Sequence, residues 1–447
     1  MKRTRTLAEH WLWLGVTSIA AAGLYSLVPV IGRTPQLKNL PIFQQLFDVA
    51  LVVHVDLSVL IWFFSMICMG AALLMEKHSA RWPYWGKAGF WCTAIATLLM
   101  AFSPLDAWVP VKSNYIPVLH NTMFLTSLGL LFAGLLVTLI PLMVTYSRPR
   151  FWKAQGPIGG AWLAAALTVM LGLFGYYLGA RVLPEGLELV DHYEKLFWAG
   201  GHIMQFAFTL LVMASWLLLL QALGSNLPKP KAALAIYAIT ILGALASLAG
   251  FAIETDSAEF NNHQTRIMIE WGGVGATLMA ALIIFKLLKT KITHDIRAYG
   301  SALIVSLFLF FAGGVLGLMI SGQNVTIPAH YHGMIVGITQ ALMGVAYVML
   351  PRFGYASVAH TRLVFWQPIV YGVGQTMHVG GLAYCGGYGI LRKTAGGFDN
   401  LAPDIKIALG IFGMGGLLAI IGGILFVIVM LRAALKGASG SHHRFLI

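Results

Sequence analysis

Twelve long apolar runs are the feature of this sequence that most limits its fold. Each run reaches about 20 residues, the length that a helix needs to cross roughly 30 Å of hydrocarbon. A segment inside a membrane must satisfy its backbone hydrogen bonds internally, so runs of this length predict helices. The sequence therefore predicts an all-α polytopic membrane protein with twelve transmembrane helices, near 9–32, 43–75, 86–107, 116–146, 158–181, 190–222, 232–253, 264–288, 298–320, 328–350, 364–390 and 405–433.

The composition excludes the soluble classes of protein. Hydrophobic residues make up 58% of the 447 residues and charged residues only 10%, whereas soluble domains have about 45–50% and about 25%. A nucleic-acid-binding chain is excluded on the same ground, so no nucleic-acid partner is expected. No repeat or long linker marks a second domain, and we expect one transmembrane domain over residues 1–447.

The basic residues indicate the orientation in the membrane. Most of the 29 Lys and Arg fall on the side of the N-terminal Lys2, Arg3 and Arg5, and cytoplasmic loops carry the excess of positive charge. We therefore expect a multi-pass protein of a bacterial-type inner membrane with both termini cytoplasmic, and we interpret the net charge of +13 mainly as a topology signal. The acidic residues cluster on the opposite, outer side, as Glu185, Glu188, Asp191, Glu194, Glu254, Asp256 and Glu259.

Histidines inside the spans are the candidate functional residues, because an ionisable side chain within a membrane is costly and usually serves a function. His54 lies in the outer half of the second span, and His202 lies at a similar depth in the sixth. His330 and His332 begin the tenth span, and His263 precedes the eighth. These histidines are expected to meet at one level of the bilayer.

The spacing of His330 and His332 predicts two cofactors on one helix. Residues two positions apart on a helix are separated by about 200°, so the two imidazoles face opposite ways. We expect one heme held on both faces by His54 and His332, and a second heme held by His330 alone. Six-coordinate iron transfers electrons, and five-coordinate iron also binds a small gas.

With these residues the sequence resembles catalytic subunit I of the heme-copper oxidase superfamily over nearly its whole length. That family has twelve helices, a low-spin heme ligand on helix 2, a metal-ligand histidine on helix 6 and an HxH motif on helix 10. Here the matching segments are VVHVDLSVLIWF with His54, WAGGHIMQF with His202, and IPAHYHGMIVG. The resemblance implies a catalytic oxidoreductase domain, and it implies that Arg392 and Lys393, between spans 11 and 12, bind heme propionates.

The second metal of the family is where this sequence departs from the pattern. The family holds that metal with the helix 6 histidine and an adjacent His-His pair after helix 7, and no such pair exists here. Depending on the register, the pair becomes Glu254-Thr255 or Asn262-His263. We expect His202 and His263 with Glu254 or Glu259 as ligands, a set that favours non-heme iron over copper. The alternative is that the second metal is absent.

The expected reaction follows from a second departure. Oxygen reductases of this family resemble one another in a tyrosine beside the second metal, often four residues after the helix 6 histidine, where this chain has Phe206. Reduction of nitric oxide to nitrous oxide does not need that phenol, so the resemblance favours the nitric oxide reductase branch. The alternatives are that Tyr193 or Tyr331 supplies the phenol, and that the substrate is O2.

Proton supply is expected from the outer side. Few polar side chains lie below His202 in the sixth span, whereas the outer carboxylates are numerous. Glu270, inside the eighth span, is expected to be buried and to donate protons to the catalytic site, or else to pair with Arg266 one turn earlier.

The complete prediction is a respiratory oxidoreductase with two hemes, of the b type, and one non-heme metal. Cys68, Cys92 and Cys385 form no CxxC or CxxCH motif, so the chain lacks its own copper-thiolate or cytochrome c centre. An outer-side donor subunit carrying cytochrome c or a copper centre is therefore expected. Two further alternatives are a diheme electron-transfer or sensing protein without the second metal, and a twelve-helix solute transporter.

Overall fold

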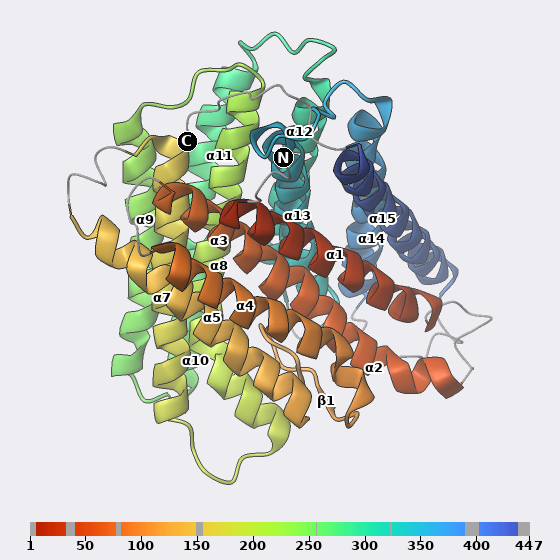
Figure 1. The fold of residues 1–447 in the computed structure, drawn as a ribbon. Coiled ribbons are helices and arrows are strands. Elements are labelled where there is room, and N and C mark those ends of the chain that lie inside the picture. Colours follow the sequence, from red (N-terminus) through yellow and green to blue (C-terminus); the bar gives the residue numbers. More distant parts are fainter. Residues whose placement is uncertain are drawn as a thin grey trace.

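Long helices packed side by side make up the computed structural model of this protein (Figure 1). It describes residues 6–32, 41–76, 82–148, 155–255, 257–321, 324–388 and 402–436. The elements are α1 (Leu7–Gly32), α2 (Pro41–Asp56), a π-helical turn (Leu57–Ile61), α3 (Trp62–Met75), α4 (Trp82–Phe102), a 3-10 turn (Ser103–Leu105), β1 (Pro110–Val111), β2 (Val118–Leu119), α5 (Thr122–Tyr146), α7 (Pro157–Arg181), α8 (Leu189–Ala222), α9 (Pro230–Ala249), a 3-10 turn (Gly250–Ala252), α10 (Ala258–Trp271), α11 (Val274–Leu287), α12 (Arg297–Leu318), α13 (Thr326–Arg352), α14 (Arg362–Gly387) and α15 (Pro403–Leu435).

The twelve-helix prediction is confirmed. Eleven segments of the described chain are long and apolar enough to cross a membrane, and α14 is the twelfth long helix, at the predicted place. Polar residues such as Gln367 lower the hydropathy of α14. Gln367 is buried, but its Oε1 accepts from the Tyr347 hydroxyl of α13 at 3.1 Å and its Nε2 donates to the Gly422 carbonyl of α15 at 3.3 Å. Neighbouring helices thus satisfy the polar groups that the membrane cannot.

Two predicted spans are interrupted in ways that the apolar pattern does not reveal. The second span is α2, the π-helical turn and α3 in one continuous run, and the π turn directly follows Asp56. The eighth span begins early, at Ala258, and Gly272 and Gly273 separate α10 from α11. Glycine disfavours an unbroken helix because it loses more conformational freedom than other residues do.

A short β-hairpin occupies the start of the predicted fourth span. Its strands pair antiparallel, with Pro110 opposite Leu119 and Val111 opposite Val118. Helix α5 therefore begins only at Thr122, where the Asn121 side chain caps it by accepting from the Phe124 amide at 2.8 Å. The hairpin lies at one end of the bundle, and the first residues of α1 and the last residues of α15 lie toward the opposite end (Figure 1).

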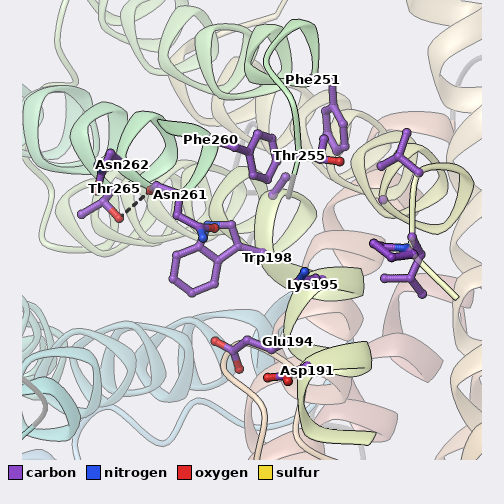
Figure 2. A pocket seen from close by; sticks show the side chains of 15 residues that line it. Asp191, Glu194, Lys195, Trp198, Phe251, Thr255, Phe260, Asn261, Asn262 and Thr265 are labelled. Carbon is purple, nitrogen blue, oxygen red and sulfur yellow. Dashed lines mark hydrogen bonds between the residues drawn. The ribbon is translucent and has the colours of Figure 1, made fainter. Parts of the chain in front are cut away.

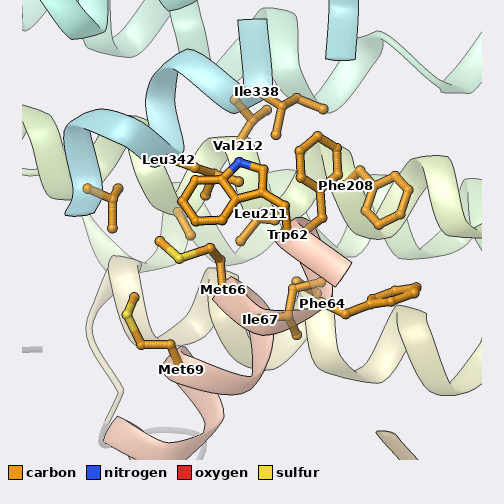
Figure 3. Close-up of a cluster of buried hydrophobic side chains, with 14 of the residues drawn as sticks. Trp62, Phe64, Met66, Ile67, Met69, Phe208, Leu211, Val212, Ile338 and Leu342 are labelled. Carbon is orange, nitrogen blue, oxygen red and sulfur yellow. The ribbon is translucent and has the colours of Figure 1, made fainter. Parts of the chain in front are cut away.

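Four helical segments form the centre of the bundle. An 18-residue window is 89% buried in the span Gln45–Met75, in α8 and in α13, and 78% buried in α7, against 33–39% in the other seven candidate spans. Phe63 and Phe64 of α3 pack against Phe208 of α8, with ring centroids 5.0 and 5.7 Å apart, and Leu342 of α13 belongs to the same buried cluster (Figure 3). His54, His202, His330 and His332 lie on three of these four central segments, whereas His263 lies on α10, in one of the less buried spans.

Candidate functional site

His54 is anchored to the first helix. It lies on α2, partly buried, and its Nδ1 lies 2.8 Å from the Ala22 carbonyl oxygen of α1. A carbonyl oxygen only accepts, so Nδ1 carries the hydrogen and Nε2 carries the lone pair. This hydrogen bond fixes the tautomer and the ring direction, as is usual for histidines that ligate a metal.

His330 is anchored in the same way to the helix before its own. Its Nδ1 donates to the Gly313 carbonyl of α12 at 2.8 Å. A Cβ at Gly317 would lie 2.6 Å from the His330 ring, so glycine is needed there for the imidazole to pack against α12. His330 therefore also presents Nε2 as the available lone pair.

His332 faces a different helix, as its spacing from His330 predicts. Its Nε2 lies 3.0 Å from Oε1 of Gln375 on α14, and its ring centroid lies 4.8 Å from that of His378. His378 donates from Nδ1 to the Phe412 carbonyl of α15 at 3.1 Å. Gln375 is a neighbour of the site that sequence reasoning missed.

The hydrogen bonds of two of the three predicted heme ligands suit ligation through Nε2. His54 and His330 have the tautomer that ligation through Nε2 requires, and both are held by backbone carbonyls. His332 donates its Nε2 hydrogen to Gln375, so ligation through this nitrogen requires that hydrogen bond to break. Arg392 and Lys393, the predicted propionate partners, lie outside the described residues.

His202 has a partner that the sequence did not predict. The imidazole is 3% exposed on α8, and its Nδ1 donates to the Trp198 carbonyl at 2.8 Å. The hydroxyl of Tyr115, in the turn between β1 and β2, donates to Nε2 at 2.9 Å. Both nitrogens of His202 are therefore engaged within the chain.

The hairpin is built to hold Tyr115 against α8. Tyr115 has a φ of 62°, a rare conformation for a bulky residue. The carboxylate of Glu194 on α8 accepts hydrogen bonds from the backbone amide of Asn114, at 2.7 Å, and from its side chain. Lys112 pairs with Asp48 of α2 at 3.0 Å. The turn is thus fixed to two of the central helical segments.

The glycine doublet before His202 makes room for two tyrosines. A Cβ at Gly201 would lie 2.2 Å from the Tyr115 ring, and a Cβ at Gly200 would lie 2.1 Å from the Tyr176 ring. Burial, followed by the nearby carboxylate of Glu194, raises the pKa of Tyr115 well above its ordinary value. The phenol therefore keeps its hydrogen at neutral pH and remains a donor.

The predicted ligands of a second metal do not come together. Nε2 of His263 donates to the Ala246 carbonyl of α9 at 3.0 Å, because the imidazole packs over Gly250 and not toward α8. Glu254 and Glu259 are exposed, since the break between α9 and α10 leaves them at the surface of the bundle. Within the described chain, no group of three or more His, Cys, Asp or Glu side chains is placed to hold a metal ion. The residues present do not fit this metal.

Glu270 is not the buried carboxylate that we expected. Its side chain is 46% exposed, and Oε1 accepts from Nε of Arg266 at 2.6 Å. The helical phase of α10 turns both side chains outward, which corresponds to the alternative of an ion pair one turn apart.

The two tyrosines considered as phenol donors lie elsewhere. The hydroxyl of Tyr193 lies 2.7 Å from Nδ1 of His120, and Tyr331 is 43% exposed. Phe206, four residues after His202, is fully buried beside Ile203 and Ala244. The phenol at His202 comes instead from Tyr115, which lies 87 residues away in the chain.

A pocket opens beside His202 at the hairpin end of the bundle. Its volume is about 450 Å³, and its walls come from α7, α8, α10 and the loops that join them. Trp198 lies between the carboxylates of Asp191 and Glu194 on one side and the side chains of Phe260 and Asn261 on the other (Figure 2). Because the Trp198 carbonyl holds His202, the pocket ends one helical turn from the imidazole.

Two relatives match this chain in sequence over most of its length, and a solved structure matches it in fold. An uncharacterized protein of Rickettsia prowazekii is 28% identical, with 95% of each chain covered. An uncharacterized protein of Aquifex aeolicus is 25% identical over 77% of this chain and 85% of its own. A cryo-EM structure of a heme-copper terminal oxidase dimer has the same fold, with a TM-score of 0.76 at 14% identity over 99% of this chain and 86% of that one.

The family follows from a match along most of the chain. The model of the family described as cytochrome c and quinol oxidase polypeptide I matches residues 7–418, from the start of α1 into α15. Proteins of this heme-copper oxidase family bind hemes and a binuclear metal centre, and they work in membranes with electron donors. The chain belongs to the cytochrome c and quinol oxidase polypeptide I family and is a multi-pass membrane oxidoreductase.

Proposed function

We propose that this protein is a diheme oxidoreductase that reduces nitric oxide to nitrous oxide with electrons from a donor on the hairpin side. The observation that carries the proposal is the anchoring of His54 and His330. Both donate Nδ1–H to backbone carbonyls, on two of the most buried spans, and both leave Nε2 for iron. His378 also donates from Nδ1 to a carbonyl, so what distinguishes His54 and His330 is this anchoring together with their places in the VVHVDLSVLIWF and IPAHYHGMIVG segments on the most buried spans.

In this proposal His54 and His332 hold the electron-transferring heme, and His330 holds the gas-binding heme. Bound heme would supply an iron that changes oxidation state by one electron and that can bind a small gas. The chain contributes the histidine ligands and, because these lie on the most buried spans, surroundings that exclude water. The absence of a CxxCH motif favours non-covalent hemes of the b type.

Protons are proposed to enter from the hairpin side. Below His202, the hydroxyls of Thr209 and Ser215 donate to carbonyls of α8 itself, at 2.9 and 2.8 Å, so they do not link to one another. The pocket with Asp191 and Glu194, by contrast, ends at Trp198. Supply from this side suits a reaction that consumes two NO, two electrons and two protons and yields one N2O and one water.

Oxygen reduction on the same scaffold is the second candidate. The observation that favours it is the Tyr115 hydroxyl at 2.9 Å from His202, because oxygen reductases of this family have a phenol beside that histidine. Phe206 favours nitric oxide as the substrate, because it occupies the position where oxygen reductases of this family usually have the tyrosine.

Substrate consumption by the purified protein distinguishes these candidates. The reduced protein is given NO under anaerobic conditions and, separately, O2, and a gas electrode follows each. We expect NO consumption with a stoichiometric yield of N2O, and its loss in His330→Ala. Rapid O2 uptake with no NO consumption would establish the second candidate, and neither activity would reduce the role to electron transfer.

The partner and the location complete the proposal. The three cysteines of the chain are free, and Cys68 and Cys385 are buried, so they form no electron-entry centre. An outer donor subunit carrying cytochrome c or a copper centre is therefore proposed, with the chain in a bacterial-type inner membrane. The excess of basic residues on the side of the termini supports this orientation.

A further inference from the structure

We propose that a phenol–imidazole pair, Tyr115 and His202, replaces the second metal of the family in this protein. The gas-binding pocket would then be closed by a hydrogen-bonded pair, and its only metal would be the heme iron. This inference rests on the proposed heme at His330. It concerns what lies at His202, where the family holds its second metal, which the proposed function leaves open.

Too few side chains are placed to ligate a metal at His202. A protein metal site needs three or more ligands with free lone pairs. His202 uses Nδ1 as a donor to Trp198, and its Nε2 already accepts from Tyr115. His263 donates its Nε2 hydrogen to α9, and no cluster of three ligands exists within the described residues. Among the described residues a metal at His202 would therefore lack the second and third ligands that it needs, even if Nε2 of His202 exchanged Tyr115 for the metal.

Neighbouring residues hold Tyr115 in contact with His202. A tyrosine with a φ of 62° is strained, and such strain persists only where neighbouring contacts impose it. Glu194 holds the preceding residue by two hydrogen bonds, and the Ser113 hydroxyl donates to the Ile116 carbonyl at 2.5 Å across the turn. Gly201 provides the space that the phenol ring fills. The backbone conformation of Tyr115, the hydrogen bonds of the turn and the space at Gly201 therefore all support the contact between Tyr115 and His202.

The Tyr115–His202 pair also offers a small ligand different chemistry from that of a metal. A hydroxyl held on an imidazole inside a buried site offers one polar donor to a small ligand and no Lewis acid. Such a pocket suits a neutral diatomic molecule that is bound by iron and accepts one hydrogen bond. The pair also closes the hairpin end of the site, because Tyr115 and Trp198 both lie against His202, with ring centroids 4.9 Å from the imidazole.

The experiment combines metal analysis with infrared spectroscopy of bound CO. Full-length protein is purified as the wild type, Tyr115→Phe, His202→Ala and Tyr193→Phe. The last is a matched control, because the Tyr193 hydroxyl also bonds a histidine, His120, but not at this site. Iron, copper and zinc are measured against heme, and CO on the reduced heme is then photolysed at low temperature.

We expect iron equal to heme in all four proteins, with no copper or zinc at comparable amounts. Photolysed CO should give no band of CO on a second metal. The C–O stretch of the heme-bound CO should shift in Tyr115→Phe and His202→Ala, and should stay unchanged in Tyr193→Phe.

Two results would overturn the inference while the proposed function stands. One is an additional metal per chain that is lost in His202→Ala, and the other is a C–O stretch that Tyr115→Phe leaves unchanged. Protein that contains no heme would overturn the proposed function, and the inference with it.

Discussion

At the scale of single residues, the hydrogen bond on one imidazole nitrogen decides what the other can do. His54, His202 and His330 all donate Nδ1–H to backbone carbonyls. Nε2 of His202 is then occupied by Tyr115, whereas His54 and His330 keep theirs for a ligand. His263 donates through Nε2 and so has the opposite tautomer.

Removing either ligand of the electron-transferring heme should remove its low-spin spectrum. We expect His54→Ala and His332→Ala each to lose the low-spin signal completely while CO still binds the other heme, because bis-histidine ligation needs both rings. Optical spectra of the reduced proteins, with and without CO, measure this. His378→Ala is the control, since His378 touches His332 but is bonded to Phe412. Loss of the low-spin signal in His378→Ala alone would reassign the ligand.

Removing His330 should have the converse effect. His330→Ala is expected to abolish CO binding and gas reduction and to leave the low-spin spectrum in place, because the two rings on α13 face different helices. The same spectra check it. A variant that still binds CO at the wild-type level would show that another residue holds the gas-binding heme.

The sequence identifies some site residues and misses others for a physical reason. Ionisable residues inside apolar runs stand out, so His54, His202, His330 and His332 are found from one chain. Tyr115 is missed because its contact with His202 spans 87 residues and depends on a positive φ that no local pattern encodes. For carboxylates the sequence predicts too much burial, because apolar neighbours in the sequence do not reveal which face of a helix points outward. Glu270 is an example, since it lies in a predicted span but its side chain is exposed.

At the scale of elements, the β1–β2 hairpin and α8 act as one unit. The hairpin contributes the phenol, and α8 contributes the histidine, the carboxylate that holds the turn and the glycines that admit both tyrosine rings. Apolar runs predict the helices well, but the hairpin residues Val118 and Leu119 are as apolar as a transmembrane helix, so the predicted fourth span includes them. Short connecting elements cannot be separated from spans by hydropathy alone.

A single methyl group at Gly201 should disturb this unit. Gly201→Ala places a Cβ 2.2 Å from the Tyr115 ring, and such overpacking costs about 1–3 kcal/mol. We expect a lower unfolding temperature in detergent and a shifted C–O stretch, because the phenol must move away from His202. Gly129→Ala on α5 has open space around its Cβ and serves as the control, with an unchanged or slightly higher unfolding temperature. Equal unfolding temperatures of Gly201→Ala and Gly129→Ala would show that the Tyr115 ring does not pack tightly against Gly201.

At the scale of the whole molecule, the bundle places its polar chemistry on its central helices and its apolar surface outside. Three of the most buried spans carry His54, His202, His330 and His332, and the peripheral helices expose large apolar residues such as Leu98, Phe285 and Leu318. The number, order and approximate bounds of the helices follow from the sequence, because length and hydropathy determine what crosses a membrane. The way the helices pack, which sets the partners of each histidine, does not.

Twelve crossings with basic residues on the side of the termini predict that both ends of the chain are cytoplasmic. A fluorescent protein fused to the C-terminus should fluoresce, and alkaline phosphatase at the same position should be inactive. A fusion of alkaline phosphatase to the 183–188 segment, between α7 and α8, should be active and is the control for export. Active phosphatase at the C-terminus would contradict the proposed orientation.

The most direct test of the account is the heme content of the purified protein, measured as the pyridine hemochrome together with the reduced-minus-oxidised spectrum. The account predicts two b-type hemes per chain, one low-spin and indifferent to CO, the other able to bind it. A colourless protein, or one with a single heme that survives in both His54→Ala and His330→Ala, would contradict it.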